Sequence, residues 1–431
     1  MNSAALFLTP AAPAGRGIWD QSRHLAFAIC GLAFALRIAA FFALGRAHRP
    51  DVWESEAIAT SLAEGHGFVY QFLGTTYRSY LEPLYPAFCA FLYTLTGHSF
   101  VALGVAQALL GSALVWLVFV CGRRVGGDRP ALWAALLAAA HPALVVYATK
   151  FHPFILDSLF LALVATACLL FSGARPWRSV VLIGGAVGLC ALSRATVLAC
   201  LPVIGWWVWN RSAGPTRAKV GQLAALSLMA ALVMSPWVLR NYHVHERFML
   251  TRSGTSLVFW LGNNPYRFTG SAATPDGRAL YDLLPAADRA HLETLDELGQ
   301  QDFFLAQARR HVREHPLGFV QRWAVKWYYF WWQTPQAGRL YPTAGLRVYQ
   351  VYYLAIVALA IKGVVGNWRR REVVLLVGLC LSIAALQSAY YIEGRHRLAI
   401  EPLLLILTGM ALSSLRGRDG QLLPWGKKAT S

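Results

Sequence analysis

Long apolar windows follow one another along most of this 431-residue chain. A helix needs about 20 apolar residues to cross the hydrocarbon core of a bilayer, and the pattern predicts ten such spans. The predicted spans are 24–45, 99–121, 130–147, 153–172, 178–193, 195–210, 218–239, 345–364, 372–390 and 397–415. We therefore expect an all-α polytopic membrane protein.

Two further apolar windows are less suited to crossing. "PLYPAFCAFLYTLT" (83–96) has 14 residues, and as a helix it would reach only about 21 Å. "LGFVQRWAVKWYYFWW" (317–332) places Arg322 and Lys326 four residues apart, on one helical face among aromatic residues. Both patterns are typical of amphipathic helices that lie in the membrane interface.

Basic residues in the short loops set the expected orientation, because such loops gather on the cytoplasmic side. These loops contain Arg123, Arg124 and Arg129, then Arg175 and Arg178, then Arg211, Arg217 and Lys219, then Lys362 and Arg369 to Arg371, and lastly Arg416, Arg418, Lys427 and Lys428. All of them and both termini fall on one side if the two short windows lie in the interface. If both windows crossed, the loops between 122 and 219 would move outside.

This topology leaves two large loops on the outer face. We expect a transmembrane region at 1–239 with a first outer loop at about 46–98, an outer loop region with an interfacial helix at 240–344, and transmembrane helices with a cytoplasmic tail at 345–431. About twenty polar or mixed residues precede the first apolar run, so no cleavable signal is expected.

Composition excludes several classes of function. The chain is 56% hydrophobic and 14% charged, with a mean hydropathy of +0.44, which excludes an ordinary soluble domain. The formal charge of +18 sits largely in short loops, so no nucleic-acid partner is expected. The seven cysteines lie in apolar segments without a CxxC pair, and no histidine has a matching ligand set. No metal and no cofactor are expected.

The first outer loop is acidic although the chain is basic. "RPDVWESEAIATSLAEGHGF" (49–68) carries Asp51, Glu54, Glu56 and Glu64. The pattern predicts a helix over 52–64 that ends before Gly65, and Asp51 with Glu54 fits a capping box. A carboxylate at this position is either a cap or a general base, because a helix N-terminus holds it ionised.

Four stretches occur in the order in which a known family has them. They are "DVWESEAIATSLAEGHGF", "EPLYPAFCAFLYTLTG", "PWVLRNYHVHERFMLTRSGTSLVFWLGNNPYRFTG" and "RHRLAIEPLLLIL". Together they resemble the bacterial GT-C membrane glycosyltransferases of the dolichyl-phosphate-mannose protein mannosyltransferase and aminoarabinose transferase kind. The resemblance implies a GT-C-like bundle of about ten transmembrane helices with amphipathic surface helices and two outer-face loops.

The resemblance also implies catalytic acids. Asp51 stands seven residues before Ile58, which matches the family spacing D-x-x-x-Y-x-x-I-A, so it is the first candidate for the base and Glu54 is the second. The family tyrosine is Ser55 here. Asp157 in "KFHPFILDSLF" matches a second family acid, and its alternative role is a polar residue paired with Lys150 or His152.

Cations are expected to bind the donor phosphate. The family pattern K-P-P-L becomes "LEPL" (81–84) here, so its lysine is missing, and Arg78 is either a substitute for it or an exposed loop arginine. The planar guanidinium of arginine suits phosphate. Arg395 and Arg397, at the outer mouth of the last span, are preferred over Arg240, which lies where a span meets the second outer loop, and Arg78 is the weakest candidate. Arg194 in "ALSRATV" either binds phosphate or marks a tight outer turn.

"GNNP" (262–265) approximates another family run. Asn263 and Asn264 either hydrogen-bond sugar or acceptor hydroxyls or serve as turn residues with positive φ.

The resemblance implies that a sugar is transferred from a polyprenyl-phosphate donor to a glycan, lipid or protein acceptor. A carboxylate base and inversion at the sugar are expected, at the periplasmic face of a bacterial inner membrane. A transporter or flippase of lipid-linked sugars is the alternative, but such proteins show paired repeats and a midplane site, which this sequence lacks. A non-catalytic scaffold leaves Asp51, Asp157 and Arg395 without a joint purpose.

Overall fold

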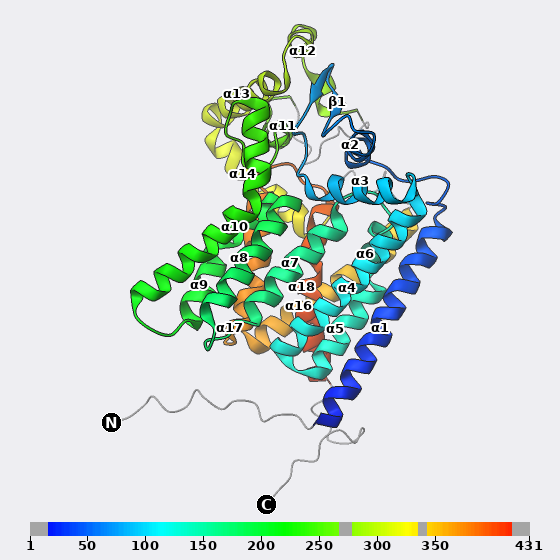
Figure 1. Ribbon diagram of the computed structural model, residues 1–431, viewed down its shortest axis with the longest axis vertical. Coiled ribbons are helices and arrows are strands. Elements are labelled where there is room, and N and C mark those ends of the chain that lie inside the picture. Colours follow the sequence, from blue (N-terminus) through cyan, green and yellow to red (C-terminus); the bar gives the residue numbers. More distant parts are fainter. Residues whose placement is uncertain (1–15, 267–277, 335–342, 416–431) are drawn as a thin grey trace, which may run out of the picture.

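The computed structural model describes residues 16–266, 278–334 and 343–415. The predicted basic tail residues Arg416, Arg418, Lys427 and Lys428 lie outside the described residues. A bundle of helices forms the lower part of the molecule, and a smaller group of helices sits on its upper end (Figure 1).

The bundle is built from apolar helices whose order follows the predicted spans. It contains α1 (Arg16–Ala43), α4 (Phe100–Gly126), α5 (Asp128–Ala140), α6 (Pro142–Tyr147), α7 (Phe154–Leu169), α8 (Pro176–Ser193), the 3₁₀ helix η1 (Ala195–Cys200), α9 (Leu201–Arg211), α10 (Thr216–His245), α16 (Thr343–Asn367), α17 (Arg371–Gln387), the 3₁₀ helix η3 (Gly394–Ala399) and α18 (Glu401–Leu415). Every predicted span contains a helix, so the expected all-α polytopic class is confirmed.

The lengths of these helices differ. Within the described residues, five helices are long and apolar enough to cross a membrane: α1, α4, α8, α10 and α16. Others are shorter or interrupted, since α5 stops at His141 before Pro142, and the window 195–210 begins as η1. The number of crossings therefore stays a prediction.

The elements on the upper end are called the cap here. The cap comprises α2 (Glu54–Ala63), β1 (Tyr70–Phe72), β2 (Thr75–Tyr77), α3 (Leu84–Thr96), α11 (Thr255–Gly262), the 3₁₀ helix η2 (Leu280–Leu283), α12 (Ala286–Glu293), α13 (Glu297–Glu314) and α14 (Pro316–Trp331). It has a small apolar core of its own, which includes Leu257, Trp260, Leu292 and Phe304. The two predicted outer loops thus fold together as one layer.

The two short apolar windows are both helices of the cap. Helix α3 runs across the end of the bundle (Figure 1). Helix α14 directs its lysine inward: the Lys326 side chain is buried and donates to the carbonyl oxygens of Gly262 and Ala389 and to Asn263 Oδ1 at 3.1–3.3 Å. Burial, with the charge of Arg322, lowers the pKa of Lys326 to about 7. Lys326 therefore joins α14 to two neighbouring segments rather than reaching toward water.

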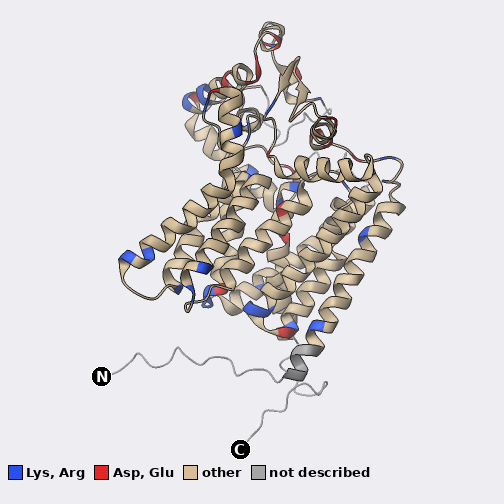
Figure 2. Ribbon diagram, in the orientation of Figure 1, with Lys and Arg blue, Asp and Glu red and all other residues tan. Residues whose placement is uncertain are grey.

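The basic loops gather at the end of the bundle opposite the cap, where Figure 2 shows many Lys and Arg residues. Arg370 donates to the carbonyl oxygen of Val125 at 3.0 Å, and Arg211 lies 3.8 Å from Glu372. Loops far apart in the sequence therefore meet there. This is the arrangement that the charge pattern predicts, and its assignment to the cytoplasm stays a prediction.

The first outer loop differs in part from expectation. Helix α2 begins at Glu54 with Trp53 at its N-cap and no side-chain cap, so the predicted capping box of Asp51 and Glu54 is wrong. The helix ends as predicted, with Gly65 at φ +82°. The antiparallel hairpin β1–β2 was not predicted, and its turn has Leu73 and Gly74 at positive φ.

Glycines allow close helix contacts in the bundle. A Cβ on Gly363 of α16 would collide with the carbonyl oxygen of Leu407 on α18, whereas a Cβ on Gly366 of the same helix would meet open space. Small residues at helix crossings let the backbones approach closely. Such close packing stabilises helix association inside a membrane, where the hydrophobic effect does not drive it.

This contrast gives a paired prediction. We expect Gly363→Ala to lower the stability of the protein in detergent by about 1–3 kcal/mol, because the added methyl group forces α16 away from α18. Gly366→Ala, three residues further on, is expected to be neutral or stabilising by up to about 1 kcal/mol, since alanine favours the helix. Thermal unfolding of both purified variants tests this, and equal melting temperatures would contradict the packing.

Candidate functional site

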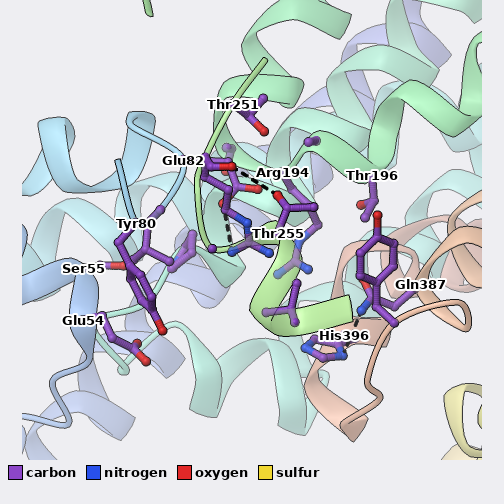
Figure 3. Close-up of a pocket in the computed structure, with 18 of the residues that line it drawn as sticks. Glu54, Ser55, Tyr80, Glu82, Arg194, Thr196, Thr251, Thr255, Gln387 and His396 are labelled. Carbon is purple, nitrogen blue, oxygen red and sulfur yellow. Dashed lines mark hydrogen bonds and ion pairs between the residues drawn. The ribbon is translucent and has the colours of Figure 1, made fainter. Parts of the chain in front are cut away.

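A cavity of about 520 Å³ opens where the cap meets the bundle. Its walls come from the start of α2, the segment after β2, the residues before α7, the turn after α8, the segment between α10 and α11, and the residues around η3. Figure 3 shows Glu54, Ser55 and Tyr80 on one side and Thr196, Gln387 and His396 on the other. Helix ends far apart in the sequence therefore contribute to one site.

Three arginines line this cavity within the described part of the chain: Arg194, Arg252 and Arg395. Each has an acidic partner. Arg194 Nε lies 2.6 Å from Asp157 Oδ2, Arg252 lies 3.4 Å from Glu82, and Arg395 lies 2.6 Å from Glu393. Paired arginines at a membrane boundary keep their charge without facing hydrocarbon alone.

Asp157 does not line the cavity but stands behind Arg194. Its side chain is 2% exposed, and it accepts hydrogen bonds from Arg194 Nε at 2.6 Å and from Ser193 Oγ at 2.8 Å. The partners considered from the sequence, Lys150 and His152, are not the ones it has. This geometry fits a residue that positions Arg194.

Glu54 faces the cavity from the first turn of α2. It has no hydrogen-bond or ion-pair partner among the residues that the structure describes. Beside it, the Ser55 hydroxyl is buried and also lacks a partner among them. A half-buried carboxylate and a hydroxyl are thus both available to a ligand at this wall.

Asp51 lies next to this wall but is not among the residues that line the cavity. The segment that carries it pairs with the residues before α7, through a parallel bridge between Val52 and Phe151 and a 3.0 Å bond from Phe151 N–H to the Asp51 carbonyl oxygen. Lys150 then reaches Asp51 Oδ2 at 2.8 Å, and Arg46 reaches it at 3.2 Å.

The charge of Asp51 is stabilised by these contacts. Trp53 Nε1 also donates to Asp51 Oδ1, at 3.0 Å. Partial burial disfavours the ionised form, but the hydrogen bond and charge of Lys150, with Arg46 and Trp53, lower the pKa of Asp51 overall. These partners contact both carboxylate oxygens, and 23% of the Asp51 side chain remains exposed.

His152 is a further polar group of the wall. It lies edge-on to Trp53 and stacks on Phe154. Burial, and next the nearby charge of Arg395, put the pKa of His152 well below its usual value. Its Nδ1 and the Thr196 hydroxyl are buried without partners among the described residues. Such groups are costly to leave unbonded, so they favour a polar ligand.

Three other predicted arginines lie away from the cavity lining. Arg397 is buried against Glu401 at 3.1 Å and donates to the Trp332 carbonyl oxygen at 2.8 Å. Arg240 donates to the Arg78 carbonyl oxygen and to Ser79 Oγ, while the Arg78 side chain is exposed. These contacts fit structural roles, because each joins separate segments of the chain.

The two asparagines have structural contacts as well. Asn263 Nδ2 donates to the carbonyl oxygens of Phe259 and Ala389 at 2.9 and 2.8 Å, and Asn264 Nδ2 donates to that of Trp260. Neither lines the cavity. Asn263 has φ −147°, so it also lacks the positive φ that the turn interpretation expected.

Several residues of the lining were missed by sequence reasoning. They are Glu82, His152 as a lining group, Thr196, Arg252 and His396. Glu82 stands at the second position of "LEPL", and Arg252 lies within "FMLTRSGTS", so both were in stretches already noted. Only their ion pair shows that Arg252 supplies a cation beside the loop whose family lysine is missing.

No group of three or more His, Cys, Asp and Glu side chains within the described residues is placed to hold a metal ion. The arrangement offers three guanidinium groups that are each paired with an acid, and Glu54 on the side of the cavity formed by α2. Guanidinium groups bind phosphate with paired hydrogen bonds, and a carboxylate accepts a proton from a hydroxyl or amine. The site is therefore suited to bringing a phosphate ester and a protic acceptor together.

The family described as dolichyl-phosphate-mannose-protein mannosyltransferase matches residues 82–239 of the chain. No curated protein matches the chain. Among solved structures, the archaeal oligosaccharyltransferase AglB from Archaeoglobus fulgidus, in complex with an inhibitory peptide and a dolichol-phosphate, is similar with a TM-score of 0.54 at 13% identity, over 93% of this chain and 51% of that one. Its apo form has a TM-score of 0.52 at 12% identity, over 90% and 50% of the two chains.

ArnT from Cupriavidus metallidurans, bound to undecaprenyl phosphate, has a TM-score of 0.42 at 14% identity, over 93% of this chain and 79% of that one. The fold assignment rests on the archaeal structures, and this chain spans about half their length. The expected resemblance is confirmed: residues 82–239 match the protein mannosyltransferase family in sequence, and the fold is similar to that of the archaeal oligosaccharyltransferase.

Proposed function

We propose that the chain is a membrane glycosyltransferase that moves a sugar from a polyprenyl-phosphate donor to an acceptor at the periplasmic face of a bacterial inner membrane. The observation that carries the proposal is the meeting of Arg194, Arg252 and Arg395 with the cavity-facing Glu54 in one cavity. The family match and the dolichol-phosphate in the structure of the archaeal enzyme support a lipid-linked donor.

The proposed reaction is an inverting displacement. The acceptor oxygen or nitrogen attacks the anomeric carbon, and the bond from that carbon to the phosphate oxygen breaks. The electron pair of this bond leaves with the polyprenyl phosphate, whose growing charge the arginines stabilise. The proton of the acceptor passes to a carboxylate of the first outer loop.

Two carboxylates meet the requirements for the base in different ways. Glu54 lines the cavity and has no partner among the described residues. Asp51 is held ionised by Lys150, Arg46 and Trp53 at the adjoining wall, and its side chain is partly exposed. The base is one of these two carboxylates, and substitution of each in turn shows which of them it is.

A midplane transport route is less well supported than transfer. The cavity lies at the junction with the cap, and its polar lining comes from segments at the ends of the helices. A transporter would instead place its substrate site near the bilayer midplane. We therefore give transfer precedence over transport.

The first prediction concerns the base. Asp51→Asn and Glu54→Gln each keep the shape of the side chain but remove its negative charge. We expect the variant of the base to lose about 10²- to 10⁴-fold in kcat, and the other variant to lose less. Transfer from a synthetic polyprenyl-phosphate sugar in detergent measures both.

Glu64→Gln is the matched control, since Glu64 is exposed just past the end of α2 and pairs with His66. It should transfer sugar like the wild type. Full activity in both Asp51→Asn and Glu54→Gln would rule out a carboxylate base in this loop.

The second prediction concerns the phosphate. Arg252→Gln should weaken binding of polyprenyl phosphate by about 10- to 100-fold, because a charge-assisted hydrogen bond is lost and Glu82 remains as an uncompensated negative charge. The affinity of the purified protein for polyprenyl phosphate is the measurement, repeated at increasing salt.

Arg247→Gln offers the same substitution outside the cavity. Arg247 forms an exposed two-bond ion pair with Asp302 at 2.8 and 3.0 Å. The Arg247→Gln variant should bind polyprenyl phosphate with the same affinity as the wild type. Equal losses in both variants would point to general charge rather than to a phosphate site at Arg252.

A further inference from the structure

Trp53 lies between the two chemical halves of the site. Its indole Nε1 donates to Asp51 Oδ1 at 3.0 Å, and the Arg395 guanidinium lies over its ring, 4.5 Å from the ring centroid. Trp53 and Arg395 both line the cavity. One side chain thus contacts a carboxylate of the first outer loop and an arginine from near the start of the last helix.

The orientation of the indole is fixed by its surroundings. Trp53 is the N-cap residue of α2, with extended backbone at φ −136°. The Trp53 and His152 rings make an edge contact, with their centroids 5.3 Å apart and an angle of 83° between the ring planes. His152 is itself stacked on Phe154 at 3.8 Å. The ring is therefore held against the residues before α7, as is Asp51 through its backbone.

We infer that Trp53 is a positioning residue that couples the two halves of the site: its N–H orients the Asp51 carboxylate, and its ring face holds Arg395 at the cavity wall. The inference rests on the proposed function with Asp51 as the base. Phenylalanine at this position keeps an aromatic face but has no N–H, and leucine has neither. The two contacts can therefore be separated by substitution.

Loss of the N–H acts on Asp51, whose other charged neighbours are Arg46 and Lys150. A hydrogen bond to the ionised form lowers a carboxyl pKa, so its removal raises that pKa. The acidic limb of the pH profile of sugar transfer should therefore lie at higher pH in Trp53→Phe than in the wild type, by up to about one pH unit. The ring face remains, so affinity for phosphate should stay unchanged.

Loss of the ring face acts on Arg395. A guanidinium over an aromatic ring gains a stabilisation that corresponds to about tenfold in an equilibrium. Trp53→Leu should therefore show the same pH shift as Trp53→Phe and, in addition, about tenfold weaker binding of polyprenyl phosphate. A residue with a merely structural role would lower stability or kcat without this separation of the two effects.

The experiment compares the wild type, Trp53→Phe, Trp53→Leu and Trp323→Phe as full-length proteins in detergent. Trp323 is the matched control, since its indole donates to the Ala385 carbonyl oxygen at 3.0 Å and it does not line the cavity. Each protein is checked for a single size-exclusion peak. Transfer is then measured over a pH series, and affinity is measured for undecaprenyl phosphate without sugar.

Trp323→Phe should match the wild type in both measurements. An unmoved acidic limb in Trp53→Phe, or wild-type phosphate affinity in Trp53→Leu, would overturn the coupling. A wild type that transfers no sugar would instead reject the proposed function, and the binding arm would still test the contact between the ring and Arg395.

Discussion

The buried ion pair of Asp157 and Arg194 is the interaction on which the cavity depends. An arginine at the end of an apolar bundle is stable only when a counter-charge or water meets it. Asp157, in the first turn of α7, supplies that charge, and Ser193 bonds its second oxygen. The partners lie on α7 and just after α8, and removing the arginine would leave Asp157 buried without its counter-charge, at a cost of several kcal/mol.

Hydrogen bonds between charged side chains and backbone groups join segments of the cap to one another and to the bundle. Glu297, at the start of α13, accepts the backbone N–H groups of Arg78 and Ser79 at 2.6 and 3.0 Å, and Arg240 at the end of α10 donates to the same segment. Lys326 joins α14 to the ends of α11 and α17. Polar bonds thus connect the cap to the helix ends of the bundle.

The site was predictable in kind but only partly in membership. Asp51, Glu54, Arg194 and Arg395 were expected from the sequence, and the structure brings the last three to one cavity with Asp51 beside it. Arg397 was expected beside Arg395, but on the 3₁₀ turn of η3 it points to Glu401 instead. A spacing of two residues does not tell which of two arginines faces the cavity, because that depends on the turn and on what packs against it.

The sequence by itself determined the class of fold, because a helix is the way in which a run of apolar residues satisfies its backbone in a membrane. It also placed the basic loops at one end of the bundle and the acids of the first loop at the other. Only the tertiary structure decided the partners: Lys150 for Asp51, Arg252 for Glu82, and Trp53 between Asp51 and Arg395. These partners are about 100 or more residues apart, except Trp53 and Asp51, and local pattern carries no information on contacts across that separation.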